Sequence, residues 1–143
     1  MRLFARDAKV EALKRMSLFE GLSRQELGEL AKRTEDMEVA PSKVLCQEGS
    51  IGQEFFVIME GEVEVTRHGR SIGTYGSGEF VGEIALIADV PRTATVTATT
   101  PLRFFVMTRQ AFLKLLDDNP RVERKVLRAL AKRVASMSTE PSV

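Results

Sequence analysis

Residues 80–96 of the chain, FVGEIALIADVPRTATV, decide its fold. Gly82 is expected to end a strand where the backbone passes close to another group. The residues that follow, Glu83 to Ile87, are expected to form one short helical turn. Pro91 stiffens the return of the chain, and Arg92 follows it closely enough to fold back over the same place. The segment therefore predicts a strand, a helical turn and a returning loop around one small site.

The residue types in this segment suit a sugar phosphate. The first amides of a helical turn have no partner within the helix, so they can bind an anion. The Arg92 guanidinium can hold a phosphate with two parallel hydrogen bonds, and the Thr93 hydroxyl can add another. Glu83 offers a carboxylate that can accept a hydrogen bond from a sugar hydroxyl. Taken singly, Arg92 could be a solvated loop residue and Glu83 a helix cap, and only the whole segment favours binding.

Outside this segment, the chain is predicted to form a single domain over residues 1–143, mainly β with flanking helices. Helices are expected at about 5–36 and 108–137, on either side of strands at about 37–107. In the glycine-rich middle part, valines alternate with polar residues, as in residues 62–66. Many short strands at even spacing indicate an antiparallel β-barrel or jelly roll.

Local capping and turn signals agree with this organisation. Ser23–Glu26 has the spacing of a capping box, and Thr108 can cap a second helix. His68-Gly69 is a hairpin-turn signal, and Asn119-Pro120 is a helix-start signal. The helix that Pro120 begins carries one apolar stripe beside many basic residues. The stripe consists of Val122, Val126, Leu127, Leu130, Ala131, Val134 and Met137.

The residue counts exclude several kinds of site. The chain has 143 residues, with one cysteine, Cys46, and one histidine, His68. A single cysteine cannot form an intrachain disulfide, and a zinc site built on several His and Cys residues is excluded. Cys46 is expected to be a buried strand residue and His68 an exposed turn residue. No catalytic group, metal site or cofactor is predicted.

The net charge of +1 hides an uneven distribution. Residues 2–16 carry five basic and two acidic side chains, residues 17–119 carry ten and sixteen, and residues 120–137 carry six and one. An acidic body without interleaved aromatic and basic residues does not resemble a nucleic-acid-binding surface. The apolar runs are too short to span a bilayer, and no apolar signal region follows the N-terminus. Neither nucleic acid nor a membrane is therefore an expected partner, and the cytoplasm is the expected location.

The segments Gly82-Glu83-Ile84-Ala85 and Pro91-Arg92-Thr93-Ala94 together resemble the phosphate-binding cassette of the cyclic nucleotide-binding domain family. This family includes regulatory subunits of protein kinases, nucleotide-gated channels and bacterial regulators of the catabolite-activator type. Glu48-Gly49, Phe55 to Ile58 and Glu60-Gly61 resemble the landmarks of its barrel. The resemblance covers about residues 17–137.

The resemblance implies a role for each matching residue. Arg92 would pair with the cyclic phosphate, and Glu83 would accept a hydrogen bond from the ribose 2′-hydroxyl. The backbone amides of Ile84 and Ala85 would contact exocyclic phosphate oxygens, and Gly82 would permit their close approach. Thr93 would contact the phosphate or the base. In this family the last helix often caps the purine and moves on binding. The candidates for this lid are Leu127, Leu130 and Val134.

The sequence therefore predicts a regulatory domain that binds a cyclic nucleotide, with cAMP expected and cGMP left open because Thr93 is compatible with both. It would act on a separate effector protein or belong to a larger signalling protein. Two rival interpretations stay open. A barrel without a ligand could serve as an interaction domain, although Glu83 and Arg92 are intact. A jelly-roll enzyme of the cupin type would need several histidines, and the chain has only His68.

Overall fold

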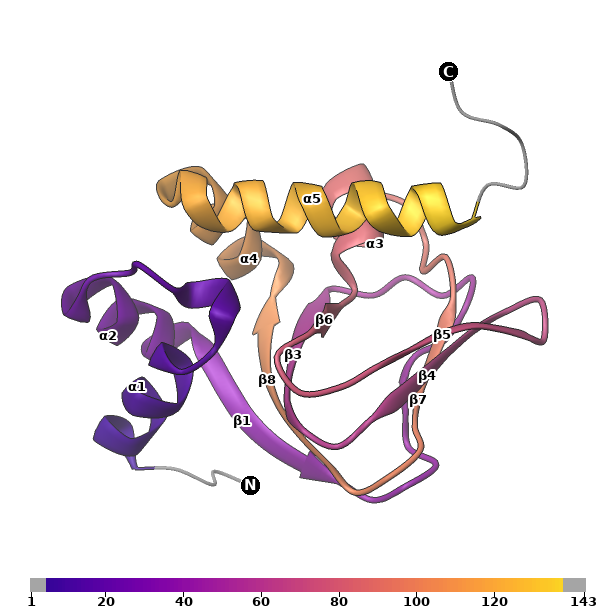
Figure 1. Cartoon of the computed structure of the whole chain (residues 1–143), viewed down its shortest axis with the longest axis horizontal. Coiled ribbons are helices and arrows are strands. Elements are labelled where there is room, and N and C mark those ends of the chain that lie inside the picture. Colours follow the sequence, from indigo (N-terminus) through magenta and orange to yellow (C-terminus); the bar gives the residue numbers. More distant parts are fainter. Residues whose placement is uncertain (1–4, 138–143) are drawn as a thin grey trace.

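Two four-stranded antiparallel sheets pack face to face at the centre of the fold (Figure 1). The structure is a computed structural model that describes residues 5–137. The first sheet has the order β1-β8-β3-β6, and the second has the order β2-β7-β4-β5. The strands are β1 (Thr34–Val39), β2 (Val44–Cys46), β3 (Glu54–Glu60), β4 (Val63–Arg67), β5 (Arg70–Tyr75), β6 (Phe80–Val81), β7 (Thr95–Ala98) and β8 (Leu102–Thr108). The predicted mainly-β jelly roll with helices at both ends is confirmed.

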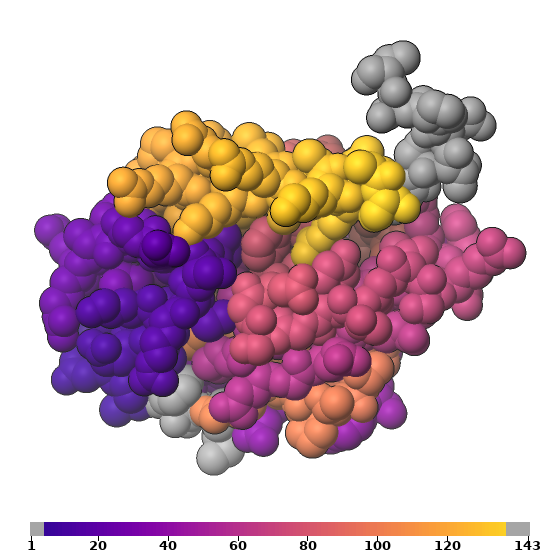
Figure 2. All heavy atoms as spheres, in the orientation of Figure 1, coloured from indigo at the N-terminus to yellow at the C-terminus, as the bar shows by residue number. Residues whose placement is uncertain are grey.

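The helices surround one end and one side of these sheets. They are α1 (Arg6–Lys14), the 3-10 helix η1 (Ser17–Phe19), α2 (Arg24–Arg33), α3 (Glu83–Ala88), α4 (Arg109–Asp118) and α5 (Pro120–Met137). Figure 1 shows α1 and α2 beside β1, and α5 lying across the top of the barrel next to α3 and α4. In Figure 2 the yellow half of α5 covers part of the barrel surface.

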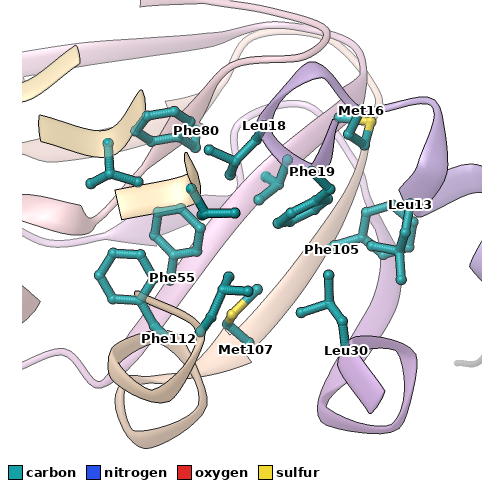
Figure 3. Close-up of a cluster of buried hydrophobic side chains, with 14 of the residues drawn as sticks. Leu13, Met16, Leu18, Phe19, Leu30, Phe55, Phe80, Phe105, Met107 and Phe112 are labelled. Atoms are coloured by element: carbon teal, nitrogen blue, oxygen red, sulfur yellow. The ribbon is translucent and has the colours of Figure 1, made fainter. Parts of the chain in front are cut away.

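Side chains of β3 alternate between two hydrophobic cores. Phe55 and Val57 face the helices, whereas Phe56 and Ile58 face the second sheet. On the helix side, the ring of Phe55 stacks on Phe112 of α4 with 4.1 Å between the ring centroids (Figure 3). Since α1, α2, α4 and the first half of α5 all contribute to this core, it joins both ends of the chain.

The local signals in the sequence form the expected structures. The Ser23 hydroxyl accepts a hydrogen bond from the Glu26 amide at 3.1 Å, and the Glu26 carboxylate accepts one from the Ser23 amide at 2.8 Å. The Thr108 hydroxyl caps α4 by accepting from the Ala111 amide at 3.1 Å. His68-Gly69 joins β4 to β5, with φ angles of 51° and 77°. These positive angles are those that a tight two-residue hairpin turn requires.

The first strand begins at Thr34 rather than near residue 37, so the N-terminal helices end at Arg33. β1 pairs with β8 along its whole length, from Thr34 opposite Met107 to Val39 opposite Leu102. The start was missed because four of the six residues of β1 are polar, so the segment lacks the alternation of a strand. The predicted single domain also includes residues 1–4 and 138–143, which lie outside the described residues.

The apolar stripe predicted for α5 is buried only in the first half of the helix. Val122 and Val126 are completely buried, whereas Leu127 and Val134 are 50% and 58% exposed. Pro120 begins the helix as predicted, but the side-chain amide of Asn119 donates to the Leu115 carbonyl at 3.0 Å and so serves the end of α4. Between residues 5 and 137, none of the helices has the length and hydrophobicity to cross a membrane.

Candidate functional site

The segment from Phe80 to Arg92 folds as predicted around a sharp turn at Gly82. This glycine has φ 100° and immediately precedes α3. A Cβ atom at this position would lie 3.0 Å from the Glu54 carbonyl oxygen and 3.1 Å from an Arg92 guanidinium nitrogen. Gly82 is therefore required both for its left-handed conformation and for the close packing of Arg92.

All six residues that were predicted to bind a ligand line one pocket: Gly82, Glu83, Ile84, Ala85, Arg92 and Thr93. Strands and loops of the barrel contribute mostly apolar side chains to the same pocket: Cys46, Val65, Ile72, Tyr75, Val81, Ala94 and Val96. The lining thus has a polar part, with Arg92, Arg133 and the Glu83 carboxylate, and an apolar part. A flat heterocycle linked to a sugar phosphate has the same division into an apolar and a charged part.

Arg92 lies at the polar end of the pocket with its guanidinium held in place. It is 5% exposed, and it donates to the backbone carbonyls of Gly82 at 3.2 Å and Glu54 at 2.7 Å. The Glu54 carboxylate lies 3.8 Å away and is more than half exposed, so its attraction is weakened by solvent. A guanidinium has five N–H donors, and the two carbonyls use two of them. Within the described chain, the others can therefore serve an anion in the pocket.

Gly52, which the sequence reading did not single out, also holds Arg92 in place. A Cβ atom at Gly52 would lie 1.9 Å from Arg92 Nε and 2.4 Å from its Cζ. The guanidinium therefore fits between Gly52 and Gly82 only because neither has a side chain. Gly52 lies shortly before β3. In the sequence, only its spacing of three positions from Gly49 could have drawn attention to it.

Glu83 is 1% exposed, and its carboxylate is paired with a residue from the last helix. The Arg133 guanidinium of α5 donates to both Glu83 carboxylate oxygens and to the Phe80 carbonyl. It also lies over two aromatic rings, 4.4 Å from the centroid of Tyr75 and 5.1 Å from that of Phe80. The ion pair and the ring contacts together place the second half of α5 over the pocket.

The residues of α5 that line the pocket are Arg133 and Ser136. The predicted lid residues Leu127, Leu130 and Val134 do not line it, and their contact with a purine stays a prediction. Sequence reasoning looked for apolar side chains and assigned the basic ones to a solvated face. The spacing of Arg133 from the buried Val122 and Val126 places all three on one face of the helix, and this was the signal that could have found it.

With Arg133 in place, the cavity has a volume of about 70 Å³. Pockets that hold a small organic ligand usually measure about 300–1,000 Å³. The space that the lining residues leave is therefore smaller than a nucleotide, and Arg133 of α5 is one of the side chains that bound it.

Cys46 lines the apolar wall and is buried, as predicted. Burial raises the pKa of the Cys46 thiol to about 11, and the nearby positive charge of Arg92 opposes this shift only in part. The thiol is therefore neutral near pH 7 and is a poor nucleophile. Among residues 5–137, no group of three or more His, Cys, Asp or Glu side chains is placed to hold a metal ion.

The family model for the cyclic nucleotide-binding domain matches residues 36–119. The chain belongs to the cyclic nucleotide-binding domain family. This match includes the whole cassette and the barrel, and it ends before α5. The membership predicted from residues 82–94 is thereby confirmed, whereas Arg133 lies beyond the matched region.

Relatives of this domain include both cAMP- and cGMP-dependent proteins. A cAMP-dependent protein kinase regulatory subunit of Yarrowia lipolytica is 36% identical over 106 residues, which cover 73% of this chain and 28% of the relative. A cGMP-dependent protein kinase of Caenorhabditis briggsae is 30% identical over 102 residues, covering 71% of this chain and 14% of the relative. The chain thus spans a third or less of the length of these curated relatives.

A solved structure shares the fold of this family member. The cAMP-bound structure of PfPKA-R superimposes with a TM-score of 0.83 at 23% identity, covering 92% of this chain and 46% of that one. At this identity the comparison shows the common fold, including helices on both sides of the barrel.

Proposed function

We propose that this domain is a receptor for a cyclic nucleotide, with cAMP as its main ligand and cGMP as the alternative. The observation that carries the proposal is the presence of two buried charged groups, Arg92 and Glu83, in the lining of one pocket. Arg92 has donors available for a phosphate, and Glu83 lies at the same end of the cavity. The apolar barrel side chains of the same pocket suit a purine ring.

Each group in the pocket has a distinct part in the proposed binding. Arg92 holds the cyclic phosphate with two charge-assisted hydrogen bonds, and the amides of Ile84 and Ala85 bind its exocyclic oxygens. Gly82 allows the phosphate to come close to the backbone. Glu83 accepts a hydrogen bond from the ribose 2′-hydroxyl, which takes the place of part of its contact with Arg133. Thr93 adds a hydroxyl near the phosphate or the base.

We assign the lid to Arg133 and Ser136, the two α5 residues that line the pocket. Because the cavity of about 70 Å³ is too small for a nucleotide, α5 opens to admit the ligand and then packs on its base. A ligand that contacts α5 in only one arrangement shifts the population toward that arrangement. The position of α5 is therefore the signal that an effector protein reads.

The proposal includes no catalytic step and no cofactor. It draws support from the neutral thiol of Cys46, and from the fact that the Yarrowia lipolytica relative is a regulatory subunit. The effector would be a protein kinase or another signalling protein in the cytoplasm, either separate from this chain or joined to it.

Calorimetric titration with four ligands tests the proposal: cAMP, cGMP, 2′-deoxy-cAMP and 5′-AMP. We expect cAMP to bind most tightly. The 2′-deoxy compound should bind more weakly because it cannot donate to Glu83. We also expect 5′-AMP to bind more weakly than cAMP. Its phosphate is not cyclic and carries more negative charge than that of cAMP, and the body of the domain is acidic. If a folded sample binds neither cAMP nor cGMP, the receptor proposal is wrong, and an interaction domain without a nucleotide ligand becomes the better interpretation.

A further inference from the structure

The loop between β2 and β3 holds the backbone of Arg92 from outside the pocket. The Gly49 amide donates to the Arg92 carbonyl at 2.8 Å, and the Arg92 amide donates to the Ser50 carbonyl at 2.8 Å. This reciprocal pair fixes the main chain from which the Arg92 side chain extends. A shift of the loop would therefore move the guanidinium relative to the pocket.

Glu48 connects this loop to two other parts of the second sheet. Its carboxylate accepts from the backbone amide of His68 at 3.0 Å and lies 3.2 Å from the His68 Nδ1 atom. Its own amide donates to the Thr95 hydroxyl at 3.0 Å. Glu48 thus ties together the loop, the turn of the β4–β5 hairpin and β7, although it does not line the pocket.

We propose that Glu48 is a positioning residue for Arg92. By anchoring the 47–50 loop to the hairpin turn, it keeps the backbone of Arg92 where the guanidinium can meet a phosphate. This inference depends on the proposed function in one respect: it assumes that Arg92 binds a cyclic phosphate. The hold of Glu48 on the Arg92 backbone is a property of the protein alone.

The hydrogen bond to the His68 amide matters more here than the ion pair. The His68 side chain is 77% exposed, and ion pairs in such surroundings contribute little. A backbone amide bound to a partly buried carboxylate is a stronger contact. The Glu48 side chain is 26% exposed, so the carboxylate itself is less solvated than the His68 ring, although the hydrogen bond lies at the surface. Glu48→Gln, which keeps an acceptor oxygen, should therefore behave like the wild type, and Glu48→Ala should not.

Amide hydrogen exchange measured by NMR in the absence of nucleotide is the first arm of the test. Glu48→Ala should speed the exchange of the Gly49 and Arg92 amides about three- to tenfold. A change of this size corresponds to the loss of roughly one hydrogen bond. Glu48→Gln should leave both rates near those of the wild type. His68→Asn should do so too, because it keeps the backbone amide and tolerates the positive φ of 51°.

Glu79→Ala is the matched control for this arm. The Glu79 carboxylate also accepts from a backbone amide, that of Gly76 at 3.0 Å, in a different turn. Its removal should leave the Gly49 and Arg92 amides unchanged. If Glu48→Ala leaves these two amides unchanged in a folded protein, the proposal is overturned, whatever ligand the domain binds.

Competition binding with cAMP is the second arm. Glu48→Ala should weaken binding about three- to tenfold, and Glu48→Gln should restore it. In an Arg92→Ala background, Glu48→Ala should cause no further loss, because it acts through Arg92. An equal loss in both backgrounds, or no loss in either despite faster exchange, would overturn the positioning role. If the wild type binds neither cyclic nucleotide, the proposed function fails, and the exchange arm still decides whether Glu48 holds the Arg92 backbone.

Discussion

At the scale of single residues, Arg92 carries the largest expected effect on binding. Arg92→Ala removes a charge-assisted contact and leaves a phosphate poorly paired in an acidic body. We expect cAMP affinity to fall by about 2–4 kcal/mol, roughly thirtyfold to a thousandfold. The fold should persist because Arg92 lies on a loop between α3 and β7. Calorimetry measures the loss, with Arg70→Ala, an exposed change on β5, as the control. Unchanged affinity in a folded Arg92→Ala protein would remove Arg92 from the site.

Gly52 provides a test of the same guanidinium that does not alter its charge. In Gly52→Ala the new methyl group would overlap Arg92 Nε, so the buried guanidinium must move away from the phosphate position. We expect cAMP affinity to fall about tenfold or more, since a loss of about 1.4 kcal/mol has that effect. Gly28→Ala is the matched control. It meets no atom within 4 Å in the middle of α2, and it should stabilise the protein by about 0.5–1 kcal/mol. Equal affinities for the two variants would show that Gly52 does not position Arg92.

The raised pKa of Cys46 predicts a slow and pH-dependent reaction with thiol reagents. Burial favours the neutral thiol, so the reactive thiolate stays the minor form until the pH approaches about 11. At neutral pH the folded protein should react about a hundredfold more slowly than the protein unfolded in urea, because its pKa is about two units higher. Stopped-flow absorbance with an aromatic disulfide measures both rates. A rate that levels off near pH 9 in the folded protein would contradict this environment for Cys46.

The residues that the sequence could predict are those inside one short motif. Gly82, Glu83, Ile84, Ala85, Arg92 and Thr93 all line the pocket because the local chain geometry between Gly82 and Thr93 brings them together. Gly52 and Arg133 could not be found in this way. Their contacts with Arg92 and Glu83 depend on long-range packing between elements that are distant in the sequence.

At the scale of elements, the second half of α5 is expected to depend on Arg133. In Arg133→Ala, the Glu83 carboxylate would remain buried without its partner, which costs about 3–5 kcal/mol unless the structure opens. We expect the helix to detach after Val126, so that water reaches Glu83. Hydrogen exchange should become faster in residues 127–136 and stay slow around the buried Val122 and Val126.

Val134→Ala is the control for this experiment, because Val134 is 58% exposed on the same part of α5. It should leave the exchange of residues 127–136 unchanged, apart from a small effect of helix propensity. If Val134→Ala loosens the helix more than Arg133→Ala does, the apolar stripe holds α5 in place and our account of the helix is wrong.

The existence of α5 could be predicted from the sequence, but the residues of its second half that are buried could not. Asn119-Pro120 and the apolar stripe indicated where α5 begins and that it is amphipathic. The surface on which it docks changes from an apolar core near Val122 to the polar edge of the pocket near Arg133. The same face of the helix stays buried, but the residue on that face changes from valine to arginine, and a sequence pattern that assumes one apolar surface misses this change.

At the scale of the whole molecule, the pocket and the helical core are linked through α5. Its first half packs in the core shared by α1, α2 and α4, and its second half covers the pocket. The charge distribution agrees with this arrangement, since a basic helix lies over an acidic body. Movement of the second half of α5 can therefore change the surface beside the pocket, while the buried first half acts as a fixed support.

Site-resolved hydrogen exchange over the whole chain, with and without saturating cAMP, tests the central claim most directly. We predict slower exchange in two separate regions, residues 80–96 of the cassette and residues 126–136 of α5, and no such change in the same experiment with Arg92→Ala. Protection in the cassette alone would show that α5 does not close on the ligand. Protection in neither region, at cAMP concentrations up to the millimolar range, would contradict the assignment of this pocket as a cyclic nucleotide site.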